Sequence, residues 1–298
     1  MTAERDSGDP SGIIQALPLW SGPVAVEPLP GGLSNANFQV VDGGRRCMVR
    51  LGDDLPFHHV FRDQEARVSR AAHAAGVSPA LIHVEDGVMV FELLEARTYG
   101  EADVRREWPR ILPLLRRCHD QVDRHLTGPA PFFWVFHVIR DYAATLRAGG
   151  GRMAGDLPQL LAIAERLEAA QVAMPVVFGH HDLLAANLLD DGERLWLVDW
   201  EYGGFGTPLF DLANLAGNAG MPAEDERALL AAYFGHGPDP ALWRAYRAMK
   251  VASLLRETLW SLVSELHMSA PGVDYAAYTA ENLARFETAL AAFEESER

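Results

Sequence analysis

The stretch VVFGHHDLLAANLLDDGERLWLVDWEY, residues 176–202, holds the densest group of side chains of the types that perform chemistry. Two apolar, strand-like runs flank Asp190-Asp191-Gly192, which is typical of a tight turn. Folding this hairpin brings Asn187 and Asp199 close together, and Asp182 lies on the loop that leads in. The sequence therefore predicts that two carboxylates and one amide converge on a small volume.

Oxygen donors of this kind suit Mg²⁺, a hard cation that takes few protein ligands and completes its shell with water and substrate phosphates. In this interpretation Asn187 and Asp199 bind the metal, and Asp182 accepts the proton of an attacking hydroxyl. Phosphoryl transfer needs little else beyond an aligned nucleophile and cations around the phosphates. The pattern therefore predicts a Mg²⁺-dependent phosphotransferase site.

The rest of the chain divides into a strand-rich part and a helix-rich part, so the predicted fold class is α+β. We expect a disordered leader over residues 1–20, a small and mostly β lobe over 21–94 with one helix at 61–75, and a larger, mostly helical lobe over 95–298. In the larger lobe the apolar periodicity predicts helices over residues 101–119, 135–148, 157–171, 224–234, 240–267 and 275–297.

Charge narrows the classes of partner. The chain has 298 residues and a formal net charge of −15, and residues 181–298 hold 19 acidic against 8 basic side chains. Nucleic-acid binding depends on basic side chains, so we expect no nucleic acid as a partner. An acidic cleft would attract a cationic small molecule, although surface acids also serve solubility. Lys250 is the single lysine and lies in no glycine-rich segment, which excludes a P-loop.

The apolar runs and the cysteines indicate the cellular compartment of the protein. No uninterrupted apolar stretch of ~20 residues occurs, so we expect no membrane insertion. Cys47 and Cys118 are isolated in sequence, without metal-binding spacing, which favours a reducing, cytoplasmic location. The sequence specifies no oligomeric state.

The spacing H-x-D-x-x-x-x-N at His180, Asp182 and Asn187, followed by Asp199 at a strand end, resembles the catalytic and metal-binding loops of the protein-kinase-like fold. The stretch DWEYGGFGTPLFDLANLAGNA, residues 199–219, is similar to the choline/ethanolamine kinase family, which is related to the aminoglycoside phosphotransferases. The resemblance covers nearly the whole chain. It implies a protein-kinase-like bilobal fold and the use of ATP and Mg²⁺.

The resemblance also implies roles for single residues of this segment. Asp182 is expected to be the catalytic residue. His180 is expected to be a packed support of the catalytic loop, His181 a spacer, and Asp211 a support that hydrogen bonds the backbone of the loop.

The nucleotide is expected at the small lobe. PGGLSNAN, residues 30–37, resembles the phosphate loop of the family, which places Gly32, Ser34 and Asn35 at the nucleotide. Taken without the resemblance, the same residues are typical of an ordinary hairpin turn. The glycines would let backbone N–H groups approach phosphate oxygens.

One charged residue interrupts the apolar strand CMVRL. From the pattern alone, Arg50 is either an outward-facing charge on a half-buried strand or a phosphate ligand. The resemblance implies the second role, paired with Glu65 on the predicted helix, because an arginine stays charged and can bind two oxygens. Arg62 and Arg67 on the same helix are expected at the surface.

The acceptor pocket is expected in the helical lobe, facing Asp182. Aromatic faces with a carboxylate nearby bind an ammonium group well. Glu257 and Trp260 are three residues apart on one predicted helix and share a face. Glu257 stands where eukaryotic members of the family carry another aromatic residue, and a carboxylate there suits a primary amine. The further candidates are Glu201, Tyr202, Trp243, Tyr246, Tyr275 and Tyr278.

These observations lead to one expected function and two alternatives. We expect an ATP- and Mg²⁺-dependent kinase that phosphorylates the hydroxyl of a small cationic alcohol, choline or ethanolamine. The first alternative is a phosphotransferase of the same fold acting on an aminoglycoside, thiamine or another metabolite. The second is a non-catalytic nucleotide-binding regulatory protein, which the presence of Asp182, Asn187 and Asp199 disfavours because a binding module needs no base.

Overall fold

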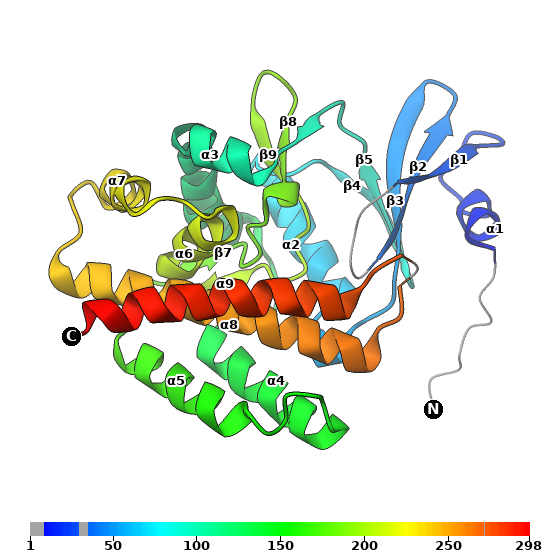
Figure 1. Cartoon of the computed structure of the whole chain (residues 1–298). Coiled ribbons are helices and arrows are strands. Elements are labelled where there is room, and N and C mark those ends of the chain that lie inside the picture. Colours follow the sequence, from blue (N-terminus) through cyan, green and yellow to red (C-terminus); the bar gives the residue numbers. More distant parts are fainter. Residues whose placement is uncertain (1–8, 30–34, 271) are drawn as a thin grey trace.

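The computed structural model describes residues 9–29, 35–270 and 272–298. At one end of the molecule an antiparallel sheet with the strand order β1-β2-β3-β5-β4 forms the N-lobe (Figure 1). The face that packs against the N-terminal segment is apolar, with Val40, Val49 and Val90 fully buried. The strands are β1 (Ala25–Leu29), β2 (Ala36–Asp42), β3 (Arg45–Leu51), β4 (Leu81–Glu85) and β5 (Val88–Glu92).

The prediction of a disordered leader over residues 1–20 is wrong for residues 10–20. A short helix, α1 (Pro10–Gln15), begins at Asp9, whose carboxylate accepts the backbone N–H of Ser11. Ile14 and Leu17 are buried against the sheet, in one apolar cluster with its valines. A helix of six residues is too short for a visible apolar period, which is why the sequence did not reveal it.

The helix predicted over 61–75 is confirmed as α2 (Arg62–Ala74), which lies between β3 and β4 in the chain. A 3-10 turn, η1 (Pro56–His58), precedes it and packs against the C-lobe. The six helices predicted for the C-lobe are all present. They are α3 (Glu101–Gln121), α4 (Val135–Gly149), α5 (Leu157–Ala169), α7 (Ala223–Phe234), α8 (Pro240–His267) and α9 (Tyr275–Ser296).

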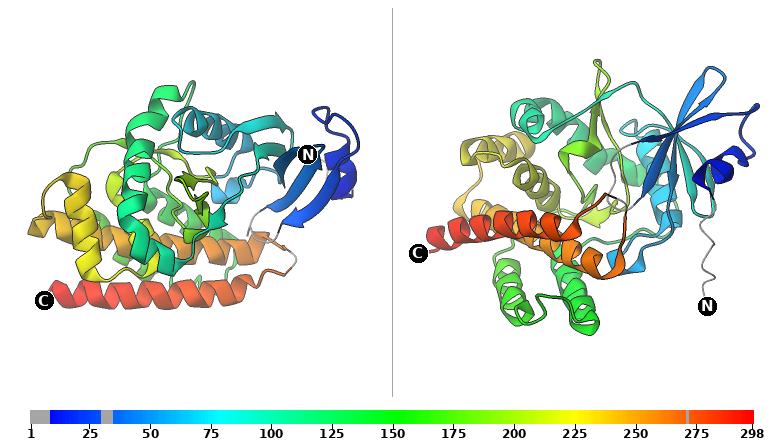
Figure 2. Two further views of the ribbon diagram at one scale, coloured as in Figure 1. Left: turned by 90° about the horizontal axis from the view of Figure 1, so that it is seen from above. Right: turned by 45° about the vertical axis from the view of Figure 1, so that its right-hand side comes forward.

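The long helix α8 forms the centre of the C-lobe. Helix α9 runs alongside it, and α4 and α5 cover another side (Figures 1 and 2). A further helix, α6 (Pro208–Ala219), was not predicted. Eleven of its twelve residues are buried, so its sequence lacks the one-sided apolar period that marks a surface helix.

Short strands at the base of the cleft carry the polar stretch of residues 176–202. Strand β7 (Val177–Gly179) pairs with β10 (Gly204–Gly206). The predicted hairpin is confirmed as β8 (Leu188–Asp190) and β9 (Leu195–Leu197), with β6 (Arg97–Thr98) of the interlobe connection as a third strand. A mostly β N-terminal part and a helical C-terminal part confirm the predicted fold class. Within the described ranges, the structure contains no helix with the length and apolarity to span a membrane.

Candidate active site

The loop after β7 is held by a buried carboxylate. Both oxygens of Asp211, at the start of α6, accept backbone N–H groups, Oδ2 from His180 and Oδ1 from His181, each at 2.8 Å. His119 of α3 also contacts Oδ2, at 3.0 Å. Burial alone would raise the pKa of Asp211, but the hydrogen bond with His119 and the nearby imidazoles hold it below its usual range. These contacts support the role expected for Asp211, whereas no local pattern pointed to His119.

Both ring nitrogens of His180 are engaged. Nε2 lies 2.9 Å from the carbonyl oxygen of Val198 and must donate, while Nδ1 accepts the backbone N–H of Asp182 at 3.3 Å. Burial lowers the pKa of His180, which keeps the ring neutral. The imidazole therefore positions the loop and has no free nitrogen to act as a base, as expected for a supporting residue.

The expectation that His181 is a spacer is wrong. Its backbone is left-handed, with φ 62°, and its buried ring stacks on Phe133 with centroids 4.4 Å apart. Nδ1 donates to the carbonyl oxygen of Tyr202 at 3.0 Å. The ring occupies space that only glycine leaves free, because a Cβ on Gly179 or Gly206 would lie 2.5 or 2.6 Å from Nε2.

Asp182 and Asn187 face each other across the loop. The Nδ2 group of Asn187 donates to the backbone oxygen of Asp182 at 2.8 Å and to its Oδ2 at 3.2 Å. Burial raises the pKa of Asp182 well above its usual range, with Arg256 opposing and Glu257 adding to the effect. Because Nδ2 is committed to Asp182, the carbonyl oxygen is the atom that Asn187 can offer to a metal.

Asp199 follows β9 in a strained conformation, with φ 68°. A left-handed backbone at a non-glycine residue is uncommon and occurs often at functional sites. Here it places Oδ1 2.9 Å from Nη1 of Arg50 in the N-lobe. The three residues predicted to converge therefore line one cleft together with Arg50.

The donor set fits a metal that arrives with phosphate ligands. Within residues 9–29, 35–270 and 272–298, no group of three or more histidine, cysteine or acidic side chains is arranged to hold an ion. Asp199 and Asn187 instead offer one carboxylate and one amide oxygen. Mg²⁺ commonly binds through one or two carboxylates plus substrate phosphates and water, so this sparse set suits it.

Arg50 and Glu65 are brought together on the N-lobe side. Nη1 of Arg50 lies 2.5 Å from Oε1 of Glu65, and Arg50 is only 6% exposed, which excludes the outward-facing alternative. Asn35, which directly precedes β2, donates from Nδ2 to Oε1 of Glu201 at 2.7 Å. Gly32 and Ser34, predicted at the nucleotide, lie outside the described residues.

The expectation that Arg62 is a surface residue is wrong. It is 8% exposed, and its Nη1 lies 2.7 Å from Glu65 Oε2 and 2.6 Å from Glu201 Oε1. Arg67 remains partly exposed and forms an ion pair with Asp63 at 3.2 Å. Glu201, expected at the acceptor, lines the cleft, but its carboxylate is bound to residues of the N-lobe.

The opposite end of the cleft combines carboxylate and aromatic groups. Glu257 accepts the hydroxyl of Tyr278 at 2.8 Å and Nη1 of Arg256 at 2.7 Å. The indole N–H of Trp260 donates to the hydroxyl of Tyr202 at 2.9 Å. These residues all line the cleft, so the predicted pair Glu257 and Trp260 shares one wall, and the candidate Tyr202 lies on it as well.

Three further acceptor candidates lie away from this wall, and one residue that was not predicted belongs to it. Trp243 and Tyr246 stack on each other, with centroids 5.5 Å apart, and do not line the cleft; neither does Tyr275. Arg256 was missed: it is 1% exposed, its guanidinium lies 4.4 Å from the centre of the Tyr202 ring, and its Nη1 is 3.8 Å from Asp182 Oδ1. Sequence pattern offered no signal for it, since an arginine on a helix is usually exposed.

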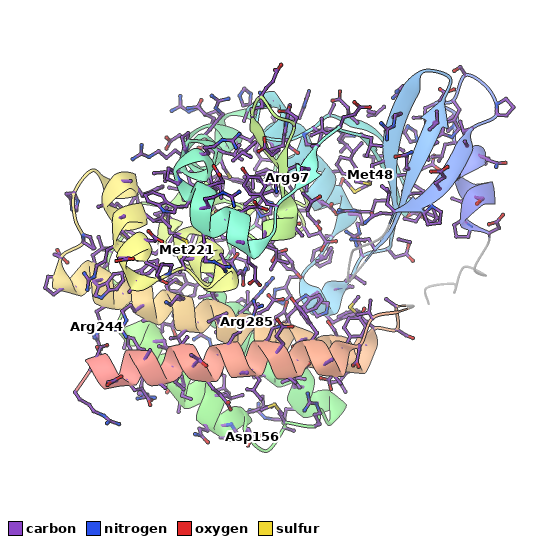
Figure 3. All side chains as sticks on the ribbon, turned by 45° about the horizontal axis from the view of Figure 1, so that its top comes forward. Met48, Arg97, Asp156, Met221, Arg244 and Arg285 are labelled. Carbon is purple, nitrogen blue, oxygen red and sulfur yellow. The ribbon has the colours of Figure 1, made fainter. Side chains whose placement is uncertain are left out.

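The cleft has a volume of about 860 Å³ and runs between the lobes. Met48 of β3 and Arg285 of α9, which both line it, lie on its two sides in Figure 3. At the N-lobe side it holds the arginine and carboxylate cluster, and at the C-lobe side the aromatic and acidic wall. Asp182 lies between the two, near Arg256 and Glu257 on one side and Asp199 on the other.

The chain is similar in sequence to known phosphotransferases. The family model described as "Phosphotransferase enzyme family" matches residues 25–249. Protein LicA of Haemophilus influenzae is 26% identical over 263 residues, which cover 83% of this chain and 75% of LicA.

Two solved structures are also similar. A choline/ethanolamine kinase family protein from Mesorhizobium loti has a TM-score of 0.72 and 30% identity, covering 95% of this chain and 97% of that one. Choline kinase LicA from Streptococcus pneumoniae has a TM-score of 0.72 at 20% identity, covering 90% of this chain and 94% of that one, and shows the shared fold.

Proposed function

Because this chain belongs to the phosphotransferase enzyme family, in its choline/ethanolamine kinase branch, we propose that it transfers the γ-phosphoryl group of ATP to the hydroxyl of a small cationic alcohol, choline or ethanolamine. One observation carries the proposal: a single cleft holds Asp182 between a cluster that contains Arg50 and a wall that contains Glu257. A phosphoryl donor and a cationic acceptor would then meet at Asp182.

The N-lobe end of the cleft is assigned to the nucleotide. Arg50, held by Glu65 at 2.5 Å, would bind the phosphates, and Gly32, Ser34 and Asn35 would approach them from the preceding loop. Burial would lower the pKa of Arg50, but the charges of Asp199 and Glu65 raise it, so the guanidinium stays protonated. A permanent positive charge is what binding of polyphosphate requires.

Asp199 and Asn187 would hold Mg²⁺ between the loop and the phosphates. The bound ion supplies positive charge that neutralises the phosphate oxygens during transfer. For the chain itself, Arg50 Nη1 lies 2.9 Å from Oδ1 of Asp199 and would orient this carboxylate for the metal.

Asp182 would accept the proton of the acceptor hydroxyl at its carboxylate. Its raised pKa makes it a better proton acceptor than an exposed aspartate. Asn187 holds Oδ2 at 3.2 Å, which restricts the rotation of the carboxylate. His180 cannot replace it, because both of its ring nitrogens are already hydrogen bonded.

The acceptor's cation would lie against the C-lobe wall. Trp260 and Tyr202 offer aromatic faces, and Glu257 offers a carboxylate, which together suit an ammonium group. Glu201 was predicted in this set as well; its contacts with Arg62 and Asn35 support a place at the junction of the lobes. The acceptor proposed here is therefore an amino alcohol.

The remaining assignments are proposals of the same kind. We propose a cytoplasmic location, supported by two cysteines, Cys47 and Cys118, that are both buried and unpaired. The net charge of −15 supports a small molecule rather than nucleic acid as the partner.

A coupled assay of ADP release tests the function. The purified chain is incubated with Mg²⁺ and ATP plus choline, ethanolamine, thiamine or an aminoglycoside, and ethyltrimethylammonium serves as a matched control that lacks the hydroxyl. We expect turnover with choline or ethanolamine and none with the control. Turnover only with thiamine or an aminoglycoside would overturn the proposal that the acceptor is choline or ethanolamine. Nucleotide binding without any turnover would favour the regulatory alternative.

A further inference from the structure

Arg62 of α2 is buried at the junction of the lobes, and every nitrogen of its guanidinium is engaged. Nε donates to the backbone oxygen of Asp53 at 3.0 Å, and Nη2 donates to Asn35 Oδ1 at 2.6 Å. Nη1 binds Glu65 Oε2 at 2.7 Å and Glu201 Oε1 at 2.6 Å. One side chain therefore joins the residue before β2, helix α2 and the segment that follows the predicted metal ligand Asp199.

The contacts close into a ring. Asn35 accepts from Arg62 through Oδ1 and donates through Nδ2 to Glu201 Oε1, which Arg62 also binds. The ring depends on a glycine beside it, since a Cβ on Gly52 would lie 2.5 Å from Asn35 Oδ1 and 3.4 Å from Arg62 Nη2. We call Asn35, Arg62 and Glu201 the interlobe ring.

The charges around the interlobe ring leave Arg62 a specific task. Two arginines, Arg50 and Arg62, face three carboxylates, those of Glu65, Asp199 and Glu201. Arg62 binds Glu201 and one oxygen of Glu65, which leaves Arg50 with the other oxygen of Glu65 and with Asp199. Glu201 Oε1 already lies 4.0 Å from Arg50 Nη1. Without Arg62, three carboxylates would compete for one guanidinium.

We propose that Arg62 is a positioning residue for the nucleotide: by holding Glu201 in the interlobe ring, it keeps Arg50 available to phosphate and Asp199 available to the metal. The inference rests on the proposed function for the identity of the ligand. Arg62 is not among the residues that line the cleft and would act through Glu65 and Glu201. Loss of Arg62 therefore weakens binding of the Mg²⁺–nucleotide complex and leaves binding of the acceptor unchanged.

The test compares Arg62→Gln with Arg67→Gln, a matched control on the same helix whose ion pair is with the exposed Asp63. Calorimetry with Mg²⁺ and a non-hydrolysable ATP analogue measures nucleotide affinity without turnover. We expect affinity to fall about tenfold in Arg62→Gln, as for the loss of a charge-assisted hydrogen bond, and to stay unchanged in Arg67→Gln. The KM for ATP should rise in parallel, and the KM for the acceptor should stay within about twofold.

Two further variants test the proposal if Arg62→Gln does not fold. Arg62→Lys keeps the charge but not the several directed donors, so it should restore part of the affinity. Gly52→Ala removes no charge, and its Cβ should displace Asn35 and weaken nucleotide binding in the same direction. Far-UV circular dichroism shows whether each variant is folded.

The outcomes separate this inference from the proposed function. If Arg62→Gln and Gly52→Ala fold and bind the analogue as tightly as the unaltered chain, the positioning role is overturned, whether or not the chain is a kinase. A rise of both KM values by the same factor would also overturn it. If the unaltered chain binds the analogue but phosphorylates no acceptor, the proposed function fails while the affinity comparison still stands.

Discussion

The imidazole of His58, in the segment between β3 and α2, stacks on the indole of Trp260 in α8, with ring centroids 4.6 Å apart and planes 18° apart. Nε2 of His58 also lies 2.8 Å from the hydroxyl of Ser264, which itself donates to the backbone oxygen of Trp260. An N-lobe residue thus forms the back of the wall proposed for the acceptor. The two lobes are tied here as well as at the interlobe ring.

This contact predicts a dependence of stability on pH. Burial, with the charge of Arg256 adding to it, lowers the pKa of His58 from 6.5 to about 2. Below pH ~6.5 the unfolded chain binds a proton at His58 that the folded chain does not. The contribution of His58 to the free energy of unfolding therefore falls by about 1.4 kcal/mol for each pH unit of acidification. Urea denaturation at pH 7, 6 and 5 measures this decline in the free energy of unfolding.

His58→Phe provides the comparison, because it keeps a ring against Trp260 and cannot bind a proton. We expect the free energy of unfolding to fall less steeply with acidification in this variant, by about 1.4 kcal/mol per pH unit. His236→Gln is the matched control, since that exposed ring contacts two near neighbours in the chain, Phe234 and Gly237. Equal slopes for His58→Phe and the unaltered chain would contradict a buried neutral histidine.

Glu257→Gln should change acceptor preference. A primary ammonium donates hydrogen bonds to a carboxylate, whereas a quaternary ammonium donates none and depends on aromatic faces. We expect kcat/KM for ethanolamine to fall about tenfold and that for choline to fall less, in steady-state assays of both substrates. Glu281→Gln, which also alters a carboxylate of the cleft, is the control. An equal loss with both substrates would show that Glu257 does not distinguish them.

Asp199→Asn should raise the Mg²⁺ requirement. An amide is a weaker ligand for a hard cation than a carboxylate, so the half-saturating Mg²⁺ concentration at fixed ATP should rise at least about tenfold. Chelation of Mg²⁺ by EDTA should abolish turnover of the unaltered chain. Asp191→Asn, in the turn of the same hairpin, should leave the Mg²⁺ titration unchanged. Identical titrations for Asp199→Asn and the unaltered chain would remove Asp199 from the metal site.

The sequence could predict those parts of the site that are set by local spacing. Asp182, Asn187 and Asp199 belong to one loop and one hairpin, so the turn at Asp190-Asp191-Gly192 is enough to bring them together. The alternation of the N-lobe strands and the periodicity of the long helices likewise follow from neighbours in the chain. Helix α6 was missed because burial on all sides removes its period.

The remaining residues owe their places to distant partners. Arg62 contacts Glu201, 139 positions away, and His58 contacts Ser264, 206 positions away. A charged residue on an amphipathic helix is normally solvated, and Arg62 is stabilised in a buried position by Glu65 on its own helix together with Glu201 and Asn35 from other segments. The same holds for Arg256, which contacts Tyr202 and Asp182 far from it in the chain as well as its neighbour Glu257. Contacts between residues so far apart in the chain produce no local pattern in the sequence.

The most direct test of the central claim replaces the proposed proton acceptor. Asp182→Asn keeps the size of the side chain and its place beside Asn187 but cannot accept the acceptor's proton. We predict that turnover with choline or ethanolamine falls by a factor on the order of a thousand, while the affinity for Mg²⁺ and a non-hydrolysable ATP analogue stays within about threefold. Turnover that survives the substitution at near its original rate would contradict the account.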